Sequence, residues 1–325
     1  MLLEALHEEQ GVHWGREGEA RVPWHYKSIE EELETLYQGA ALLDFSEHGL
    51  LELSGPDRTE FLHNQCTSDI RQMPRETWLE TLFLNAKGQI EHLGRVLHLG
   101  ESLWVSTPNA EALSRRFRRY IVFDQVEVGA LSWSLLRLQG PAAGEVAQRL
   151  LPLPAYWSLK RAPGLVVARD ELGVWLFTPS EEAAHLARQL LENGASLVGR
   201  AAWHIWRVER GQPDLPEAIG ELPQEVGLEG RVSYKKGCYL GQEIMARLEA
   251  RGQTRYQLMA LLGQTQIPPG AEVFREGRPV GRVGTAVESP EWGAVALALL
   301  RKELRPGDQV RVAGWSATVA ALPLH

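Results

Sequence analysis

Two stretches, LLELSGPDRTEFL at residues 50–62 and SLLRLQGPAAGEVAQRL at residues 134–150, share one pattern that decides the fold. Each begins with alternating apolar residues, which are typical of a half-buried strand, and each then reaches a Gly-Pro pair. An amphipathic helix pattern follows directly in both. Gly55-Pro56 therefore corresponds to Gly140-Pro141, and the chain is predicted to hold two copies of one strand-turn-helix unit.

A second pair of stretches supports the duplication. LWVSTPNAEAL at residues 103–113 and VWLFTPSEEAA at residues 174–184 both read as strands that end in Thr-Pro. A helix follows each strand, with Asn109 or Ser180 as the expected N-cap. Two landmarks in the same order predict two α+β units of ferredoxin-like type, each an antiparallel sheet with helices on one face.

The first copy is longer than the second by roughly 14 residues. The extra length falls in TLFLNAKGQIEHLGRVLHLG at residues 81–100, which is predicted to form a hairpin that turns at residues 86–89. A hairpin present in only one of two similar halves is not needed for the fold. We therefore expect it to serve function.

The two ends of the chain differ from the repeats. Residues 28–38 are predicted to form a helix, because Ser28 and Glu31 make a capping box and Gly39 follows as a stop. From residue 257 onward, short apolar strands separated by turn clusters predict a small β-barrel. The expected domains are residues 1–130, 131–250 and 251–325.

Composition limits the classes of function. No apolar run approaches the roughly 20 residues that a membrane-spanning helix needs, and the start lacks the pattern of a secretion signal. A net charge of −8 argues against coating long stretches of nucleic acid, although the basic stretch SRRFRRY could bind a short one as an alternative to being a solvated helix end. Two cysteines exclude a disulfide framework and a four-cysteine cluster. We expect a soluble cytoplasmic protein that does not engage membranes.

The segment from Trp206 to Gly252 is unlike a core element, because it mixes prolines, glycines and charges in long loops. It contains KKGCYLGQE at residues 235–243, in which the pattern K-G-C-[FY]-x-G-Q-E is complete. The residues that meet the pattern are Lys236, Gly237, Cys238, Tyr239, Gly241, Gln242 and Glu243. With RVERGQPD, LPQEVGLEG and the LNAKGQI hairpin, this pattern resembles the YgfZ family of folate-binding proteins, relatives of the glycine-cleavage T-protein (aminomethyltransferase).

The resemblance implies a T-protein-like ring of two ferredoxin-like domains and a C-terminal β-barrel, with a site for tetrahydrofolate or a one-carbon derivative. It implies an accessory role in assembly or repair of iron-sulfur enzymes, including ones that thiomethylate tRNA. The expected partners are folate, iron-sulfur client enzymes or assembly proteins, and an indirect link to tRNA. Two alternatives stay open: a tetrahydrofolate-dependent aminomethyl or one-carbon transferase, and a non-catalytic folate-sensing scaffold.

A folate pocket needs a carboxylate for the pterin and a cation for the glutamate tail. Glu209 lies where T-proteins carry a pterin-binding glutamate, so the resemblance makes it the leading contact. A surface ion pair with Arg207 or Arg210 is the alternative. The other expected folate-binding residues are Arg247 and Arg251, which follow the signature, and Asn85 and Lys87 at the hairpin turn. Each of these could instead be a plain surface residue.

The hairpin departs from the aminomethyltransferase pattern. Where those enzymes have G-G-I-I-D-D-L, this chain has K-G-Q-I-E-H-L, so that Glu91 and His92 replace two aspartates. Because the reach of a catalytic acid is critical, this departure argues against aminomethyl transfer.

Cys238 has three open interpretations. As a catalytic thiol it would be assisted by Lys236, Lys235 or the start of the following helix, all of which favour a thiolate. As a metal ligand it would need partners, and neither Cys66 nor the scattered histidines supply a metal motif. As a structural residue it would simply fill a helix entry, where Glu243 suits the helix dipole. Cys66 is expected to be buried packing.

Overall fold

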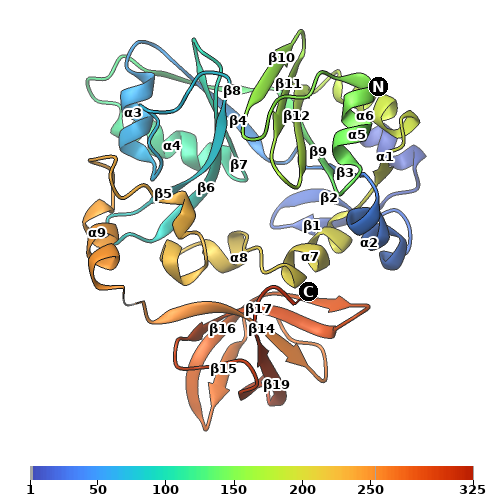
Figure 1. Ribbon diagram of the computed structural model, residues 1–325, viewed down its shortest axis with the longest axis vertical. Helices are drawn as coiled ribbons and strands as arrows, with labels where there is room; N and C mark the ends of the chain where they lie inside the picture. Colours follow the sequence, from blue (N-terminus) through green and yellow to red (C-terminus); the bar gives the residue numbers. More distant parts are fainter. Residues whose placement is uncertain (1–2, 253, 325) are drawn as a thin grey trace. The chain divides into compact units, whose positions relative to one another are not determined.

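The computed structural model describes residues 3–252 and 254–324, with the backbone alone at residue 251 (Figure 1). The chain divides into two units. The first holds Met1–Gln65, Asp69–Thr81 and Gly94–Trp203, and the second holds Cys66–Ser68, Leu82–Leu93 and His204–His325. The hairpin of residues 81–100 is shared between them, because its base belongs to the first unit and its tip to the second.

A five-stranded antiparallel sheet carries the first copy of the repeat, in the order β5-β6-β7-β4-β8. Strand β4 (Gly49–Ser54) ends at Gly55-Pro56 and α3 (Arg58–Gln65) follows, as the sequence predicts. Gly55 has a φ of +96°, and a Cβ there would lie 2.2 Å from the backbone oxygen of Gln125, so this turn requires glycine. The other elements are β5 (Trp78–Leu84), β6 (Ile90–His98), β7 (Leu103–Thr107), α4 (Ala110–Tyr120) and β8 (Glu127–Leu131).

A six-stranded sheet carries the second copy, in the order β10-β11-β12-β9-β3-β13. Here β9 (Trp133–Gln139) leads to α5 (Ala143–Leu150), and β12 (Gly173–Pro179) leads to α6 (Ala183–Glu192). β9 pairs with β12 as β4 pairs with β7, so the duplication is confirmed. The remaining strands are β10 (Leu159–Ala162), β11 (Leu165–Arg169), β3 (Ala41–Asp44) and β13 (Ser196–Leu197).

The predicted helix caps are only partly correct. Asn109 caps α4, because its side chain accepts a hydrogen bond from the amide of Ala112. Ser180 does not cap α6, since a turn closed by the amide of Glu182 and the carbonyl of Pro179 delays the helix to Ala183. The capping box of Ser28 and Glu31 at α2 (Ile29–Gln38) is confirmed. Before α2 lie α1 (Leu3–Glu9), β1 (His13–Glu17) and β2 (Ala20–His25).

A cluster of buried charges surrounds Arg200 in the first unit. Its guanidinium pairs with Glu47 and with Glu17, donates to the carbonyl of Asp44 and lies 3.8 Å above the ring of Phe45. Burial raises the pKa of Glu47 to about 7, because it outweighs the stabilising charge of Arg200. The folded protein therefore holds a proton on Glu47 at a pH where the unfolded chain does not.

We expect this carboxyl to make stability fall as the pH rises from about 4.5 to about 7. The stabilisation from the protonated Glu47 carboxyl is complete below the pKa that the residue has in the unfolded chain. It is lost as the pH rises through the pKa in the folded protein, and the change in the free energy of unfolding is about 3 kcal/mol at most. His98 acts in the opposite sense, because burial lowers its pKa. Urea unfolding of wild type and Glu47→Gln across this pH range isolates the contribution of Glu47 to the pH dependence of stability. A difference between the two proteins that does not change with pH would contradict the prediction.

The barrel of the second unit closes in the order β14-β17-β16-β15-β18-β19, which confirms the predicted fold of the chain's last part (Figure 1). Its interior is apolar, with Leu261, Val273, Val283, Ala298 and Leu300 buried. Its strands are β14 (Tyr256–Gly263), β15 (Glu272–Arg275), β16 (Arg278–Ser289), β17 (Gly293–Arg301), β18 (Gln309–Val312) and β19 (Trp315–Ala320).

Between the repeats and the barrel lie short helices and loops. They are α7 (Arg200–Glu209), α8 (Leu215–Ala218), the 3-10 turns η1 (Pro223–Glu225) and η2 (Glu229–Arg231), and α9 (Gln242–Arg251). In the part of the chain that the structure describes, none of the helices combines the length and the apolar character needed to cross a bilayer. The same residues hold no group of three or more His, Cys, Asp or Glu side chains placed to bind a metal ion.

Candidate functional site

The hairpin tip and the KKGCYLGQE loop meet inside the second unit. Gly241 has a φ of +87°, and a Cβ there would lie only 2.7 Å from the backbone oxygen of Asn85. Gly88 faces the other way across the same contact, because its Cβ would lie 2.9 Å from Ile244 and from Met245. Two glycines thus let two backbones approach more closely than side chains would allow. The two segments that sequence patterns singled out form one site.

The tip itself is shaped by Asn85. Its side-chain oxygen accepts hydrogen bonds from the amides of Lys87 and Gln89, at 2.9 and 3.0 Å. The amide of Gly88 donates to the carbonyl of Asn85 and closes the turn. Lys87 is exposed at the end of the turn. Asn85 therefore holds the loop, while Lys87 is the residue that this turn presents to solvent.

Cys238 is a free, exposed thiol that Gln242 positions. The side-chain amide of Gln242 donates to the sulfur at 3.9 Å, and its oxygen accepts from the amide of Tyr239 at 3.1 Å. The carbonyl of Tyr239 in turn accepts from the amide of Gln242. One side chain at the start of α9 thereby fixes both the loop and the sulfur. Glu243, also in the first turn of α9, is exposed.

Lys236 is buried rather than presented to solvent. Its ammonium donates to the backbone carbonyl of Cys66 at 2.7 Å and lies 4.8 Å from the ring centroid of Tyr239. Cys66 is buried, as predicted. The amine of Lys236 therefore helps to hold the loop in place, whereas Gly237 and Cys238, which follow it directly, are exposed.

Tyr239 connects the loop to the interior. It is buried in an apolar cluster with Leu84, Ile90, Val226 and Met245. Burial, together with neighbouring acidic groups, raises the pKa of its phenol above the usual value. The cluster joins residues of the hairpin to residues of α9. The loop that carries the Cys238 thiol therefore rests on closely packed side chains.

Glu209 lies at the end of α7 and is buried. Its carboxylate accepts a hydrogen bond from Ser289 at 2.6 Å, next to an apolar cluster that contains Val208, Val295 and Leu297. Glu209 is thus not a surface residue, and Arg207 pairs with Glu217. A buried carboxylate beside apolar side chains is the kind of group that a pterin requires.

The remaining predicted residues lie at the surface or outside the described side chains. Arg247 is exposed on α9, and the side chain of Arg251 is not among those described. Glu91 is exposed, and the half-buried His92 packs edge-on to Phe83 with ring centroids 6.5 Å apart. Glu209 contacts Ser289 of the barrel. Cys238 and the hairpin contact α9, and Lys236 contacts the backbone of Cys66.

Comparison with known proteins decides the family. Residues 3–236 match the family described as the GCVT N-terminal domain. The chain belongs to this family. The predicted resemblance to the YgfZ proteins and to the T-protein is confirmed.

Two relatives and one structure show the extent of similarity. The tRNA-modifying protein YgfZ of Photobacterium profundum is 28% identical over 289 residues, covering 84% of this chain and 87% of that protein. The aminomethyltransferase of Thermotoga neapolitana is 26% identical over 318 residues, covering 90% and 86%. The crystal structure of glycine cleavage system aminomethyltransferase T from Bartonella henselae has a TM-score of 0.90 and 24% identity, covering 99% of this chain and 97% of that one. This GCVT-domain protein therefore has the T-protein fold.

Sequence patterns missed the residues that hold α7 in this GCVT-domain protein. Arg207 donates to Glu217 at 3.1 Å and also pairs with Thr285 of the barrel. Glu217 caps α8 in a capping box with Asp214 and accepts from the amide of Thr285. The Asp-x-x-Glu spacing at residues 214–217 was a usable signal for that cap. No local signal marks the partnership with Arg207, because it depends on the packing of distant segments.

Proposed function

We propose that this protein is a folate-binding accessory protein that supports assembly or repair of iron-sulfur enzymes, including ones that thiomethylate tRNA. Cys238 is the residue that acts on the client, as a reactive or transiently ligating thiol. Family membership and the similarity to a tRNA-modifying protein support this role. The single observation that carries it is the exposed sulfur of Cys238, held by Gln242 on a packed base.

Tetrahydrofolate, or a one-carbon derivative of it, is the proposed cofactor. Glu209 would bind the pterin, since a carboxylate can accept several hydrogen bonds and Ser289 supplies one. When bound, the folate supplies or accepts a one-carbon group. Lys87 and Arg247 are exposed cations suited to the glutamate tail of the folate. We propose the same role for Arg251. The proposed location is the cytoplasm.

Calorimetric titration with tetrahydrofolate tests the cofactor assignment. We expect saturable binding of one equivalent, and we expect Glu209→Gln to weaken it by about tenfold or more, since a charge-assisted hydrogen bond is lost. Glu288→Gln, an exposed change close to Ser289 in sequence, is the control and should leave affinity unchanged. Absence of binding by the wild type would refute the folate assignment.

An aminomethyl or one-carbon transferase is the second candidate, favoured by the similarity to the Thermotoga neapolitana enzyme. The acids of the hairpin differ, and Glu91 is exposed. Formation of methylene-tetrahydrofolate from an aminomethylated carrier protein would support this candidate. A folate-sensing scaffold, the third, predicts instead that Cys238 is dispensable.

A further inference from the structure

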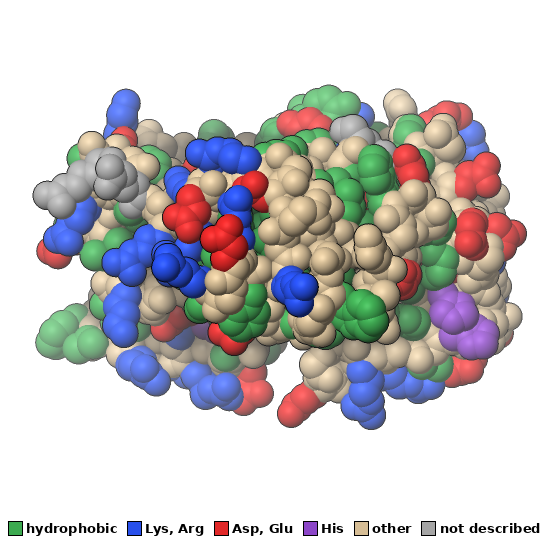
Figure 2. Space-filling view, turned by 90° about the horizontal axis from the view of Figure 1, so that it is seen from below, with side chains coloured by type: hydrophobic (Ala, Val, Ile, Leu, Met, Phe, Trp, Pro, Cys, Tyr) green, Lys and Arg blue, Asp and Glu red, His purple; other side chains and the backbone are tan. Residues whose placement is uncertain are grey.

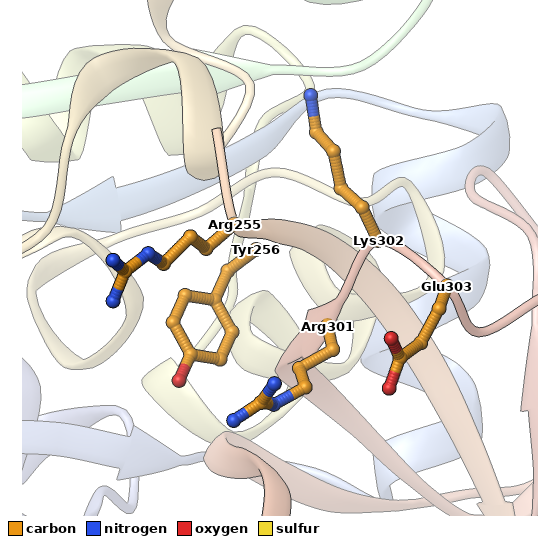
Figure 3. A pocket seen from close by; sticks show the side chains of 5 residues that line it. All are labelled: Arg255, Tyr256, Arg301, Lys302 and Glu303. Atoms are coloured by element: carbon orange, nitrogen blue, oxygen red, sulfur yellow. The ribbon is translucent and has the colours of Figure 1, made fainter. Parts of the chain in front are cut away.

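A cavity of about 310 Å³ opens where the barrel begins, and none of its lining residues belongs to the Cys238 loop. It is lined by Arg255, Tyr256, Arg301, Lys302 and Glu303. Tyr256 and Arg301 pair at the ends of β14 and β17, and Arg255, Lys302 and Glu303 lie directly beyond those ends. Figure 3 shows the ring of Tyr256 between the side chains of Arg255 and Arg301.

The cavity is positively charged in a chain whose net charge is −8. Three cationic side chains and one carboxylate line it. Within residues 3–252 and 254–324, the side chains of Arg255, Arg301 and Lys302 have no ion pair or hydrogen bond, and Glu303 has none either. Two other barrel arginines are paired, Arg275 with Asp308 and Arg282 with Glu221. Figure 2 shows that Lys and Arg side chains gather on the left part of the face it draws. An acidic protein that leaves three adjacent cations unneutralised offers a site for an anion.

The walls of the cavity are held in place from within. One oxygen of the buried Glu225 accepts from the amides of both Arg255 and Tyr256, at 3.0 and 3.1 Å. The amide of Lys302 donates to the carbonyl of Arg255 at 3.0 Å. The ring of Tyr256 packs against the apolar cluster that also holds Tyr239. The cationic side chains therefore start from a fixed backbone beside a packed aromatic ring, so binding has to order only the side chains themselves.

We propose that this cavity binds the phosphate of a nucleotide, with the base against Tyr256. Guanidinium groups match the oxygens of a phosphate in two-pronged hydrogen bonds, and an ammonium adds a point charge. An aromatic ring beside such cations accepts a nucleobase by stacking. The volume suits a ligand of nucleotide size. A free nucleotide and a nucleotide within single-stranded RNA present the same chemistry to these side chains.

Calorimetry with the full chain tests the site. We expect adenosine monophosphate to bind with a Kd of about 1 mM or lower, and to bind more tightly than ribose 5-phosphate. Changing Arg301 and Lys302 together to glutamine should weaken binding by about tenfold or more. Glu303→Gln should strengthen it by about threefold, since a repelling charge is removed. A short single-stranded RNA that binds more tightly than the free nucleotide identifies RNA as the source, and the reverse order identifies the free nucleotide.

The control is Arg278→Gln, which removes the same charge from an exposed barrel position outside the cavity. Thermal unfolding verifies that each variant is folded. Two results would overturn the proposal: no saturable binding of either ligand, or equal affinity in wild type and the Arg301/Lys302 double variant. Equal affinity for ribose 5-phosphate and the nucleotide would overturn the role of Tyr256. Because the cavity shares no residue with the Cys238 loop or Glu209, failure here leaves the proposed function standing.

Discussion

Replacing Gly241 by alanine is expected to destabilise the site by about 3 kcal/mol, because a left-handed backbone and a steric clash act together. The residue has a φ of +87°, and the added Cβ would lie 2.7 Å from the carbonyl oxygen of Asn85. The loop and the hairpin tip must then separate. Hydrogen-exchange measurements should show faster amide exchange at the hairpin tip and at the start of α9. The variant should also fail to replace the missing homologue in a bacterial deletion strain.

Gly237→Ala is the matched control in the same loop. Gly237 also has a positive φ, +94°, yet no atom lies within 4 Å of the Cβ it would gain. Only the backbone strain remains, at about 1 kcal/mol. The difference between the two variants isolates the contact with the hairpin. Equal effects of the two substitutions on stability and exchange would show that this contact does not hold the site together.

Arg207→Met is expected to have the largest effect on the second unit, a loss of about 3 to 5 kcal/mol. Arg207 and Glu217 are both buried, so removing the cation leaves a carboxylate without its counter-charge. The contact of Arg207 with Thr285 is lost as well, which removes one of the links between α7 and β16. Because Glu209 lies on α7, folate affinity should fall too.

A double variant separates charge from shape. Adding Glu217→Gln to Arg207→Met should recover part of the lost stability, since no unpaired charge then remains buried. Arg210→Met, at an exposed position of the same segment, should cost less than about 1 kcal/mol. Urea unfolding measures four variants: Arg207→Met, Glu217→Gln, the double variant and Arg210→Met. If the double variant loses more free energy of unfolding than the two single variants lose in total, the ion-pair account is contradicted.

The overall fold could be predicted because its signals are local. Alternating apolar residues that stop at Gly55-Pro56 and Gly140-Pro141 fix two strand-turn-helix units, and turn clusters after residue 257 fix the barrel. Strand β3 shows the limit. It precedes the first copy in sequence, yet it pairs with β9 of the second sheet. Nothing in a strand of four residues, three of them apolar, specifies which sheet it joins, since pairing partners are chosen by tertiary packing.

The site was predictable in its segments and not in its contacts. The signature and the hairpin were both singled out, and Gly241 and Gly88 join them. The hydrogen-bond partner of Lys236 could not be predicted from sequence, because it is the backbone carbonyl of Cys66, 170 residues away. Backbone acceptors leave no pattern of side-chain types. The burial of Glu209 could not be read from sequence either, because its partner, the hydroxyl of Ser289, is 80 residues further along the chain.

The central claim concerns the thiol of Cys238, and complementation tests it most directly. Wild type and Cys238→Ser are expressed in a bacterial strain that lacks its own homologue, and thiomethylated nucleosides in tRNA are measured by mass spectrometry. Because the thiol is exposed, the serine variant should unfold at the temperature of the wild type. We predict that the wild type restores thiomethylation and that Cys238→Ser does not. Full restoration by the serine variant would contradict the account.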